Sequence, residues 1–196
     1  MSIVIGLKYK DGVLLASDTR VVSRGHLAER NVDGKIFKSQ YSNTAIGSVG
    51  YLRDLDIISC TEEWLPYKDI LDKKKVDKKY IIENIVPKIF NTLRDNHRVN
   101  QQDGFEYTDS EFIFATPSHL YRIDEDGSVL EFDDYISVGC GEELVRGYMT
   151  KVFYNGYKDL SLEEAKFILR ECIKEACKDD IGINDESVFI NLEKGD

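Results

Sequence analysis

The sequence predicts an α+β protein folded as a four-layer αββα sandwich. Apolar runs bounded by turn residues indicate strands, and apolar residues at intervals of three and four indicate amphipathic helices. These segments follow one another as strands, two helices, strands, two helices and a final strand. Groups of strands separated by helix pairs do not fit a doubly wound parallel sheet, in which strands and helices alternate. Two stacked sheets, each covered by one helix pair, account for this order.

The first half of the chain supplies one group of strands and one helix pair. Apolar runs predict four strands, at residues 3–9, 13–18, 35–37 and 44–50. A loop is expected after the second strand, up to residue 31. Helical spacing predicts two helices, at about residues 51–65 and 77–97. The apolar face of the first helix would be formed by Leu52, Leu55, Ile58 and Trp64, and Asp77 would be the N-cap of the second.

The second half of the chain repeats this arrangement. Four strands are predicted at residues 111–115, 120–123, 129–132 and 136–141. Helices follow at about 142–155 and 161–178, and a last strand at 187–191. Ser161 and Glu164 have the S-x-x-E spacing of a capping box, in which each side chain binds the backbone N–H of the other residue.

Composition predicts a single domain, residues 1–196, in the cytoplasm. Hydrophobic residues make up 42% and charged residues 32%, which is a globular composition, and no apolar run has membrane-spanning length. The four cysteines lack metal-type spacing and are expected to be reduced thiols, and the three histidines form no ligand motif. No metal and no cofactor are therefore expected. The net charge of −10 argues against nucleic acid or an anionic membrane as a partner.

Ser2 stands at the tip of the first predicted strand, preceded only by Met1. A serine hydroxyl is a weak nucleophile until a base removes its proton. If Met1 is removed, the α-amine of Ser2 can be that base, because its ordinary pKa of about 7.7–8.0 leaves much of it neutral near neutral pH. The scattered histidines disfavour a His-based triad. The hydroxyl and the amine together indicate an N-terminal nucleophile, a known variant of triad chemistry.

Five short motifs occur in one order along the chain: S-I-V-I-G at 2–6, K-D-G-V-L-L-A-S-D-T-R at 10–20, G-K-I-F at 34–37, G-S-V-G at 47–50 and V-G-C-G at 138–141. They resemble the β-type subunits of the proteasome and the bacterial HslV peptidase, which are N-terminal-nucleophile hydrolases. The matching family segments are T-T-x-V-G…K-D-G-V-V-L-A-x-D-x-R, x-K-(I/L)-F, A-G-x-x-G and I-G-S-G. The resemblance implies that the αββα sandwich is of the N-terminal-nucleophile hydrolase type.

The resemblance implies catalytic roles for four residues. Ser2 would be the nucleophile in place of the family's Thr, and Lys35 would be a cation beside its amine. Asp18 would hold Lys35 in place, and the Gly47 N–H would face the developing oxyanion. Each has an alternative without catalysis. Ser2 could be an ordinary first residue of a strand, Asp18 and Lys35 could form a structural ion pair, and Gly47 could serve close packing or a turn.

Two positions depart from the family pattern near the site. Cys140 replaces a Ser that hydrogen-bonds near the nucleophile's amine, and a thiol does so weakly. We expect Cys140 to be a buried small residue rather than a second nucleophile. Lys178-Asp179 matches the Arg-Asp that ends the family's last long helix, and Asp179 could equally be a solvated charge at a helix end. The family's D-S-x-S-G pattern becomes Asp179-Asp180-Ile181-Gly182, which loses the second Ser, so that together with the change at Cys140 two supporting hydroxyls are missing.

These residues imply a peptide-bond hydrolase that acts through an acyl ester on Ser2. Val21, Ala45 and Val49 match family positions in the specificity pocket, which would then be apolar and prefer a hydrophobic residue before the scissile bond. The resemblance further implies a peptide or unfolded protein substrate, a homo-oligomeric ring, and a regulatory cap or ATPase as partners. Two alternatives stay open: a non-catalytic homologue that serves as a scaffold or binding module, and a peptide transferase in which an amine resolves the ester.

Overall fold

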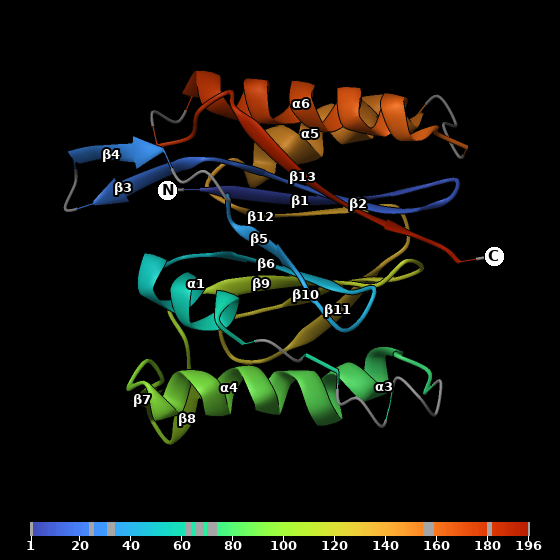
Figure 1. The fold of residues 1–196 in the computed structure, drawn as a ribbon. Helices are drawn as coiled ribbons and strands as arrows, with labels where there is room; N and C mark the ends of the chain where they lie inside the picture. Colours follow the sequence, from blue (N-terminus) through green and yellow to red (C-terminus); the bar gives the residue numbers. More distant parts are fainter. Residues whose placement is uncertain are drawn as a thin grey trace.

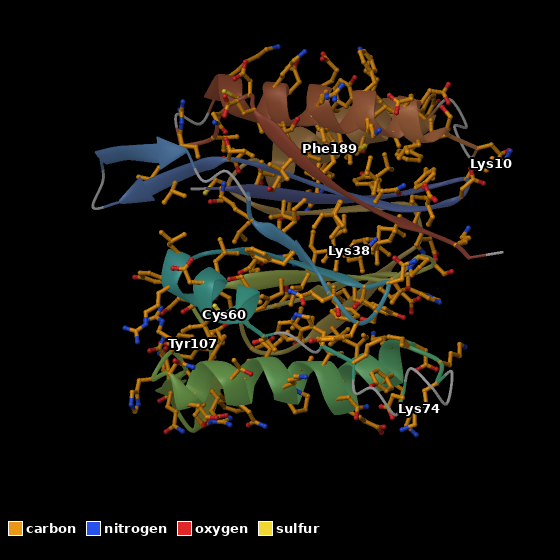
Figure 2. All side chains as sticks on the ribbon, in the orientation of Figure 1. Lys10, Lys38, Cys60, Lys74, Tyr107 and Phe189 are labelled. Atoms are coloured by element: carbon orange, nitrogen blue, oxygen red, sulfur yellow. The ribbon has the colours of Figure 1, made fainter. Side chains whose placement is uncertain are left out.

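The four predicted layers are present in the computed structural model, which describes residues 2–23, 26–30, 34–61, 64–65, 69, 74–154, 159–179 and 182–195, with the backbone alone at 23, 26–30 and 179. Two sheets stack face to face, and helices cover the outer face of each (Figure 1). Side chains fill the space between the layers (Figure 2). Among the described residues no helix is long and apolar enough to cross a membrane.

The first sheet places the start of the chain in its interior. Its strand order is β12-β1-β2-β13, and all neighbours are antiparallel. The bounds are β1 Ile3–Tyr9, β2 Gly12–Asp18, β12 Tyr135–Gly139 and β13 Ser187–Glu193. Because β1 pairs with a strand on each side, the register fixes Ile3 opposite Gly139 and Val4 opposite Ser17. The backbone next to Ser2 is therefore held from both sides.

The second sheet is built from the middle of the chain. Its antiparallel order is β11-β10-β9-β6-β5. The bounds are β5 Ile36–Lys38, β6 Ala45–Val49, β9 Glu111–Ala115, β10 Leu120–Ile123 and β11 Val129–Phe132. The inner faces of the two sheets meet in an apolar core, which includes Val4, Leu15, Ile113 and Val138. All nine strands of the two sheets lie at positions where the sequence predicts strands.

Two short hairpins were not predicted. Strands β3 (Arg20–Ser23) and β4 (His26–Arg30) form one hairpin where the sequence predicts a loop up to residue 31. Strands β7 (Asn100–Gln102) and β8 (Phe105–Tyr107) form the other. Each pairs only within itself rather than joining a main sheet, so neither needs the strong apolar alternation by which a buried strand is recognised.

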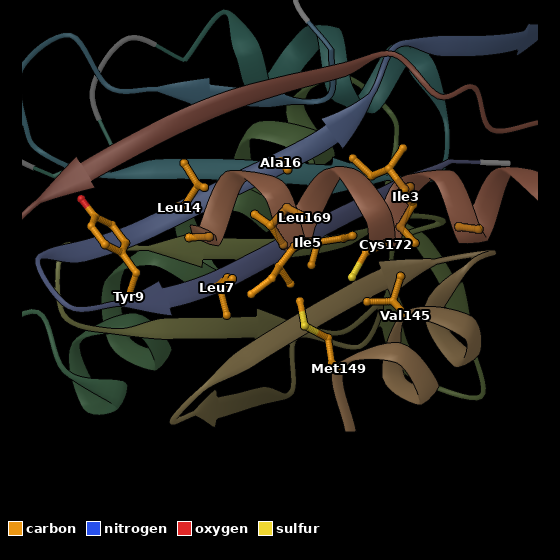
Figure 3. Close-up of a cluster of buried hydrophobic side chains, with 14 of the residues drawn as sticks. Ile3, Ile5, Leu7, Tyr9, Leu14, Ala16, Val145, Met149, Leu169 and Cys172 are labelled. Atoms are coloured by element: carbon orange, nitrogen blue, oxygen red, sulfur yellow. The ribbon is translucent and has the colours of Figure 1, made fainter. Parts of the chain in front are cut away.

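Helices α5 (Glu142–Tyr154) and α6 (Leu162–Asp179) cover the first sheet. Their buried side chains, including Met149, Leu169 and Cys172, pack on Ile5 and Leu7 of β1 (Figure 3). The predicted capping box is formed at the start of α6, because the Ser161 N–H donates to the Glu164 carboxylate at 2.8 Å and the Glu164 N–H donates to Ser161 Oγ at 3.4 Å. Burial raises the pKa of the Cys172 thiol to about 12, so this cysteine behaves as an apolar core residue.

The helices over the second sheet differ from the prediction in extent. The first, α1, runs from Leu52 to Ser59 only, although Trp64 is buried as expected. Leu52 is exposed rather than part of the buried face. The second is α3 (Lys78–Tyr80), a π-helical turn η1 (Ile81–Ile85) and α4 (Val86–Asp95). Pro87 explains the π turn, because its ring has no N–H to donate to the carbonyl four residues earlier. The predicted N-cap is confirmed, since the Asp77 carboxylate accepts from the Tyr80 N–H at 3.1 Å.

Two isoleucines in one turn test how far the burial of this helix stabilises the fold. Ile85 is fully buried against the second sheet, and Ile82 is 48% exposed. We expect Ile85→Ala to lower the free energy of unfolding in urea by about 2–5 kcal/mol, because it removes transfer energy and leaves a cavity. Ile82→Ala, the matched control, should change it by about 0.5 kcal/mol or less. Equal losses in the two variants would show that the helix does not pack as described.

Candidate active site

Ser2 lies at one end of the first sheet, where β1 begins. This end also carries the β3–β4 hairpin and faces α1 (Figure 1). Ser2 is half-buried, and its carbonyl accepts a hydrogen bond of 3.1 Å from the Cys140 N–H. Ser2 and Lys35 line one pocket together with the segment that joins β6 to α1. The structure therefore brings the two residues to the same cavity from positions 33 apart in the sequence.

Gly139 makes room for this placement of Ser2. Its φ of +106° is in the region that favours glycine, and a Cβ built on it would lie 2.2 Å from the Ser2 carbonyl oxygen. No side chain can be accommodated at that distance without moving the backbone. The glycine of the V-G-C-G motif thus permits the close approach of two strands at the tip of β1.

A buried ion pair joins Asp18 and Lys35. Lys35 Nζ donates to Asp18 Oδ1 at 2.7 Å and to the Asp18 carbonyl at 3.1 Å, and both side chains are almost completely inaccessible to solvent. The same Asp18 Oδ1 accepts from the Ile3 N–H at 3.0 Å, and Oδ2 accepts from the Arg20 N–H at 3.1 Å. The expected ion pair is therefore confirmed. One carboxylate holds both the cation and the residue that follows Ser2.

Burial determines the electrostatics of Lys35. Desolvation lowers the pKa of Lys35 below its usual value, and the attraction and hydrogen bond of Asp18 oppose that shift. The backbone also fixes its position, since the Lys35 N–H donates to Ser17 Oγ at 3.0 Å and its carbonyl accepts from the Ser48 N–H at 3.0 Å. Lys35 is thus bonded to both sheets.

The pocket beside Ser2 is small and mostly apolar. Its volume is about 40 Å³. Its lining residues are Ser2, Val21, Val22, Lys35, Ser48, Val49, Gly50, Tyr51, Leu52 and Leu55. Val21 and Val49 are therefore where the sequence places them, but Ala45 is not among the lining residues. Ala45 is buried in the core between the sheets, opposite Ala115, because its strand turns its side chain inward.

Gly47 does not face the pocket as predicted. It lies within β6, and a Cβ built on it would meet Val4 in the core between the sheets. The Ser48 N–H donates to Lys35 on the β5 side. Since successive N–H groups of a strand point to opposite edges, the Gly47 N–H points to β9, where Gly47 pairs with Ile113. The predicted oxyanion donor is thereby directed into the sheet.

The remaining predicted site residues are Cys140, which lies just before α5, and Asp179, which ends α6. Cys140 is exposed, not buried as expected, because it follows the last residue of β12 in a turn, and it contributes its backbone N–H to Ser2. The side chain of Asp179, the last residue of α6, lies outside the described residues. All four cysteines are free thiols. No group of three or more His, Cys, Asp or Glu in the described part of the chain could hold a metal ion.

Sequence reasoning missed Ser48, which lines the same pocket. It is 2% exposed, and its hydroxyl is the one buried side-chain polar atom in the described residues without a hydrogen-bond partner. The signal was present in the G-S-V-G motif, since alternation along a strand places Ser48 on the face opposite to Gly47. That face could be chosen only once the register against β5 and β9 was known.

Comparisons with known proteins agree with this fold. The sequence matches the proteasome subunit family over residues 2–190. It is 26% identical over 186 residues to proteasome subunit beta 2 of Thermofilum pendens, covering 92% of this chain and 83% of that protein. The crystal structure of HslV from Trypanosoma brucei superposes with a TM-score of 0.67 at 16% identity, over 98% of this chain and 99% of that one. The Gly-1 mutant of Anbu from Hyphomicrobium sp. strain MC1 gives a TM-score of 0.70 at 13% identity, over 98% of this chain and 82% of that one.

Removal of the Asp18 charge tests the ion pair. Asp18→Asn keeps an acceptor for the Ile3 N–H but leaves Lys35 buried without a counter-charge, so we expect a loss of about 3–5 kcal/mol of unfolding free energy near neutral pH. The pKa of Lys35 should fall further, measured by NMR titration of the lysine side chains. Stability of the variant should then rise with pH, because a lysine whose pKa is lower in the folded state favours folding once it is neutral. Asp11→Asn, in an exposed turn, is the control.

A pair of glycines tests the contact with Ser2. Gly139 and Gly104 both have positive φ, but nothing lies within 4 Å of a Cβ built on Gly104. Gly104→Ala should lower the free energy of unfolding by about 1–2 kcal/mol, through backbone strain alone. Gly139→Ala should cost about 1–3 kcal/mol more, because it overpacks the Ser2 backbone. Hydrogen exchange at the Ile3 N–H should accelerate in Gly139→Ala alone, and unchanged exchange there would refute the contact.

Proposed function

Because the chain belongs to the proteasome subunit family, we propose that it is a peptide-bond hydrolase of the N-terminal-nucleophile type with Ser2 as the nucleophile. Residues 1–196 act in this proposal as one proteasome-β-like domain. The observation that carries it is the shared pocket: Ser2 and Lys35 line one cavity, and Asp18 fixes both Lys35 and the Ile3 N–H. A hydroxyl-bearing residue and a desolvated cation that line one pocket support the proposal.

The proposed reaction proceeds through an ester. The neutral α-amine of Ser2, exposed when Met1 is removed, takes the hydroxyl proton as Oγ attacks the carbonyl carbon of a peptide bond. The C–N bond breaks, the amine product leaves with the proton, and an acyl ester remains on Ser2. Water adds to this ester with the amine again as base, and the acid product leaves. Proton transfer to a positioned base typically contributes about 10²–10⁴-fold to such a step.

Lys35 supports this chemistry by its charge. A cation in the same pocket disfavours protonation of the α-amine, because like charges repel, and so keeps the amine available as base. Asp18 acts as a positioning residue, since it holds Lys35 Nζ at 2.7 Å. Its bond to the Ile3 N–H also keeps the tip of β1 at the pocket.

The wider proposal concerns partners and place. Relatives of this chain are named as proteasome subunits, and HslV shares its fold. On that basis we propose a homo-oligomeric ring in the cytoplasm that takes peptide or unfolded protein substrates, with a regulatory cap or ATPase as a further partner. The exposed side chains of Tyr51 and Leu52 beside the pocket, and of Ile82 on η1, offer apolar surface that such a ring could bury.

Two observations favour a second candidate, a non-catalytic homologue that serves as a scaffold or binding module. The Gly47 N–H points to β9 rather than to the pocket. Cys140 supplies no hydroxyl near the amine of Ser2. Should an amine resolve the ester faster than water, the same site would be a peptide transferase, and the two products are distinguished by mass.

Two preparations test the proposal, one that retains Met1 and one that begins at Ser2. We expect only the second to form an adduct with a hydroxyl-directed covalent inhibitor, located on Ser2 by mass spectrometry. Its cleavage of fluorogenic peptides should exceed that of the first by about 10²-fold or more, because an amide nitrogen cannot act as base.

Ser2→Ala should abolish both the adduct and cleavage, whereas Ser128→Ala, in an exposed loop, should leave them unchanged. Equal activity of the two preparations would refute the N-terminal base. An assembled protein that forms no adduct in either preparation would favour the non-catalytic homologue.

A further inference from the structure

The segment of residues 50–52, which joins β6 to α1, forms one wall of the pocket beside Ser2. All three of its residues line the cavity. Tyr51 and Leu52 are 59% and 43% exposed, so packing in the core does little to hold their side chains. The backbone lies close to the residue before β9, since a Cβ built on Gly50 would be 2.4 Å from Ser110 Oγ. The polar contacts of this segment therefore decide where the wall lies.

A fully buried carboxylate, that of Asp54 in the first turn of α1, holds the backbone of Tyr51. Asp54 accepts hydrogen bonds from Arg98 Nε and, at 2.8 Å, from Ser110 Oγ. The same Ser110 Oγ accepts from the Tyr51 N–H at 3.3 Å, and the Asp54 N–H donates to the Tyr51 carbonyl at 3.0 Å. Both backbone polar groups of Tyr51 are thus connected to Asp54, one directly and one through Ser110.

Arg98, which follows the end of α4, supplies the charge that Asp54 needs. A carboxylate is stable out of water only with a paired cation, and the Arg98 side chain is itself only 22% exposed. Its guanidinium carbon lies 4.8 Å from the centroid of the Tyr51 ring, which is a cation–π contact. A second carboxylate, that of Asp109, lies 3.7 Å from Nη2 and fixes the other end of the guanidinium. One side chain therefore holds the wall both by its backbone and by an aromatic ring.

We propose that Arg98 is a positioning residue for substrate binding, because through Asp54 and Tyr51 it keeps residues 50–52 in place as a wall of the Ser2 pocket. The proposal rests on the proposed function, since it concerns how the same site binds a peptide. Arg98 does not line the pocket itself, and its ion pairs are with Asp54 and Asp109 rather than with groups at Ser2. Its loss should therefore affect the binding of a side chain in the pocket and not the reactivity of the Ser2 hydroxyl.

The size of the pocket selects the probe for this difference. Its volume is about 40 Å³, and a water-sized group needs about 10–15 Å³, so roughly three such groups fit. Valine, with three side-chain carbons, matches this volume. A displacement of about 1 Å in a positioned group can lower a rate by up to about 10²-fold, so a misplaced wall has a measurable effect on a reagent that carries valine.

Two reagents with one reactive group test the proposal on the protein that begins at Ser2. One is methanesulfonyl fluoride, and the other is the same sulfonyl fluoride on a peptide that ends in valine. Arg98→Lys keeps a cation beside Asp54 but removes the planar fork that binds the carboxylate and covers the ring of Tyr51. We expect it to slow labelling of Ser2 by the peptide reagent about tenfold or more, measured by intact mass, and to leave the rate of the small reagent within about twofold.

A matched control and a milder variant accompany this measurement. Arg94→Lys, which changes a half-exposed ion pair with Glu106 on α4, should leave both rates unchanged. Ser110→Ala removes only the hydroxyl between Asp54 and the Tyr51 N–H. It should slow the peptide reagent about 2–10-fold, the effect of one hydrogen bond, and accelerate hydrogen exchange at the Tyr51 N–H.

A merely structural role of Arg98 predicts a different result, in which the two reagents are slowed by the same factor or not at all. Either result in both Arg98→Lys and Ser110→Ala would overturn the inference. If neither reagent labels the unsubstituted protein, the proposed function fails, and calorimetric binding of a peptide that ends in valine then decides the inference by itself. About tenfold weaker binding to Arg98→Lys would support it, whereas equal binding, or no binding to the unsubstituted protein, would refute it.

Discussion

The buried ion pair between Lys35 and Asp18 connects the two sheets and the start of β1 around the candidate site. The ammonium of Lys35 is bonded to Asp18 on β2 in the first sheet, and its carbonyl is bonded to Ser48 on β6 in the second. Asp18 in turn binds the backbone N–H of Ile3. A charged pair out of water is stable only if both members are satisfied, so the geometry around it has little freedom. The position of Ser2 against the second sheet follows from this constraint.

Much of the architecture could be predicted because its elements are strongly patterned. β1, β2, β9 and β10 are short apolar runs between turn residues, and α5 and α6 repeat their apolar residues at helical spacing. The β3–β4 and β7–β8 hairpins carry no such pattern, because they pair outside the two sheets. The π turn at Ile81–Ile85 could not be predicted either. A helical turn that holds one extra residue buries the same side chains as an ordinary turn, so the apolar spacing does not reveal it.

Site residues were predicted correctly where a family motif identifies the residue. They were not predicted correctly where the strand register determines which face of the sheet a side chain is on. Asp18 and Lys35 could be expected together because the family resemblance assigns both to one site, and the structure pairs them. Gly47, Ala45 and Ser48 belong to one strand, where a shift by one residue exchanges the two faces of the sheet. Ala45 and Gly47 are turned to the core between the sheets, and Ser48 is turned to the opposite face, as is Ile46 in the core under the helices. Cys140 differs for another reason, because it acts through its backbone rather than its thiol.

The order of strands also sets when this site can exist during synthesis. The second sheet uses only residues 36 to 132 and can pair as soon as that stretch has left the ribosome. In the first sheet, β1 and β2 must wait for β12 and β13, which are translated last. Such long-range pairing is slow, because the chain loses the entropy of closing a large loop before any contact between the strands stabilises it. A nascent or truncated chain that lacks residues 135–139 would leave the start of β1 without β12 as a partner, so the surroundings of Ser2 form only after β12 has been translated.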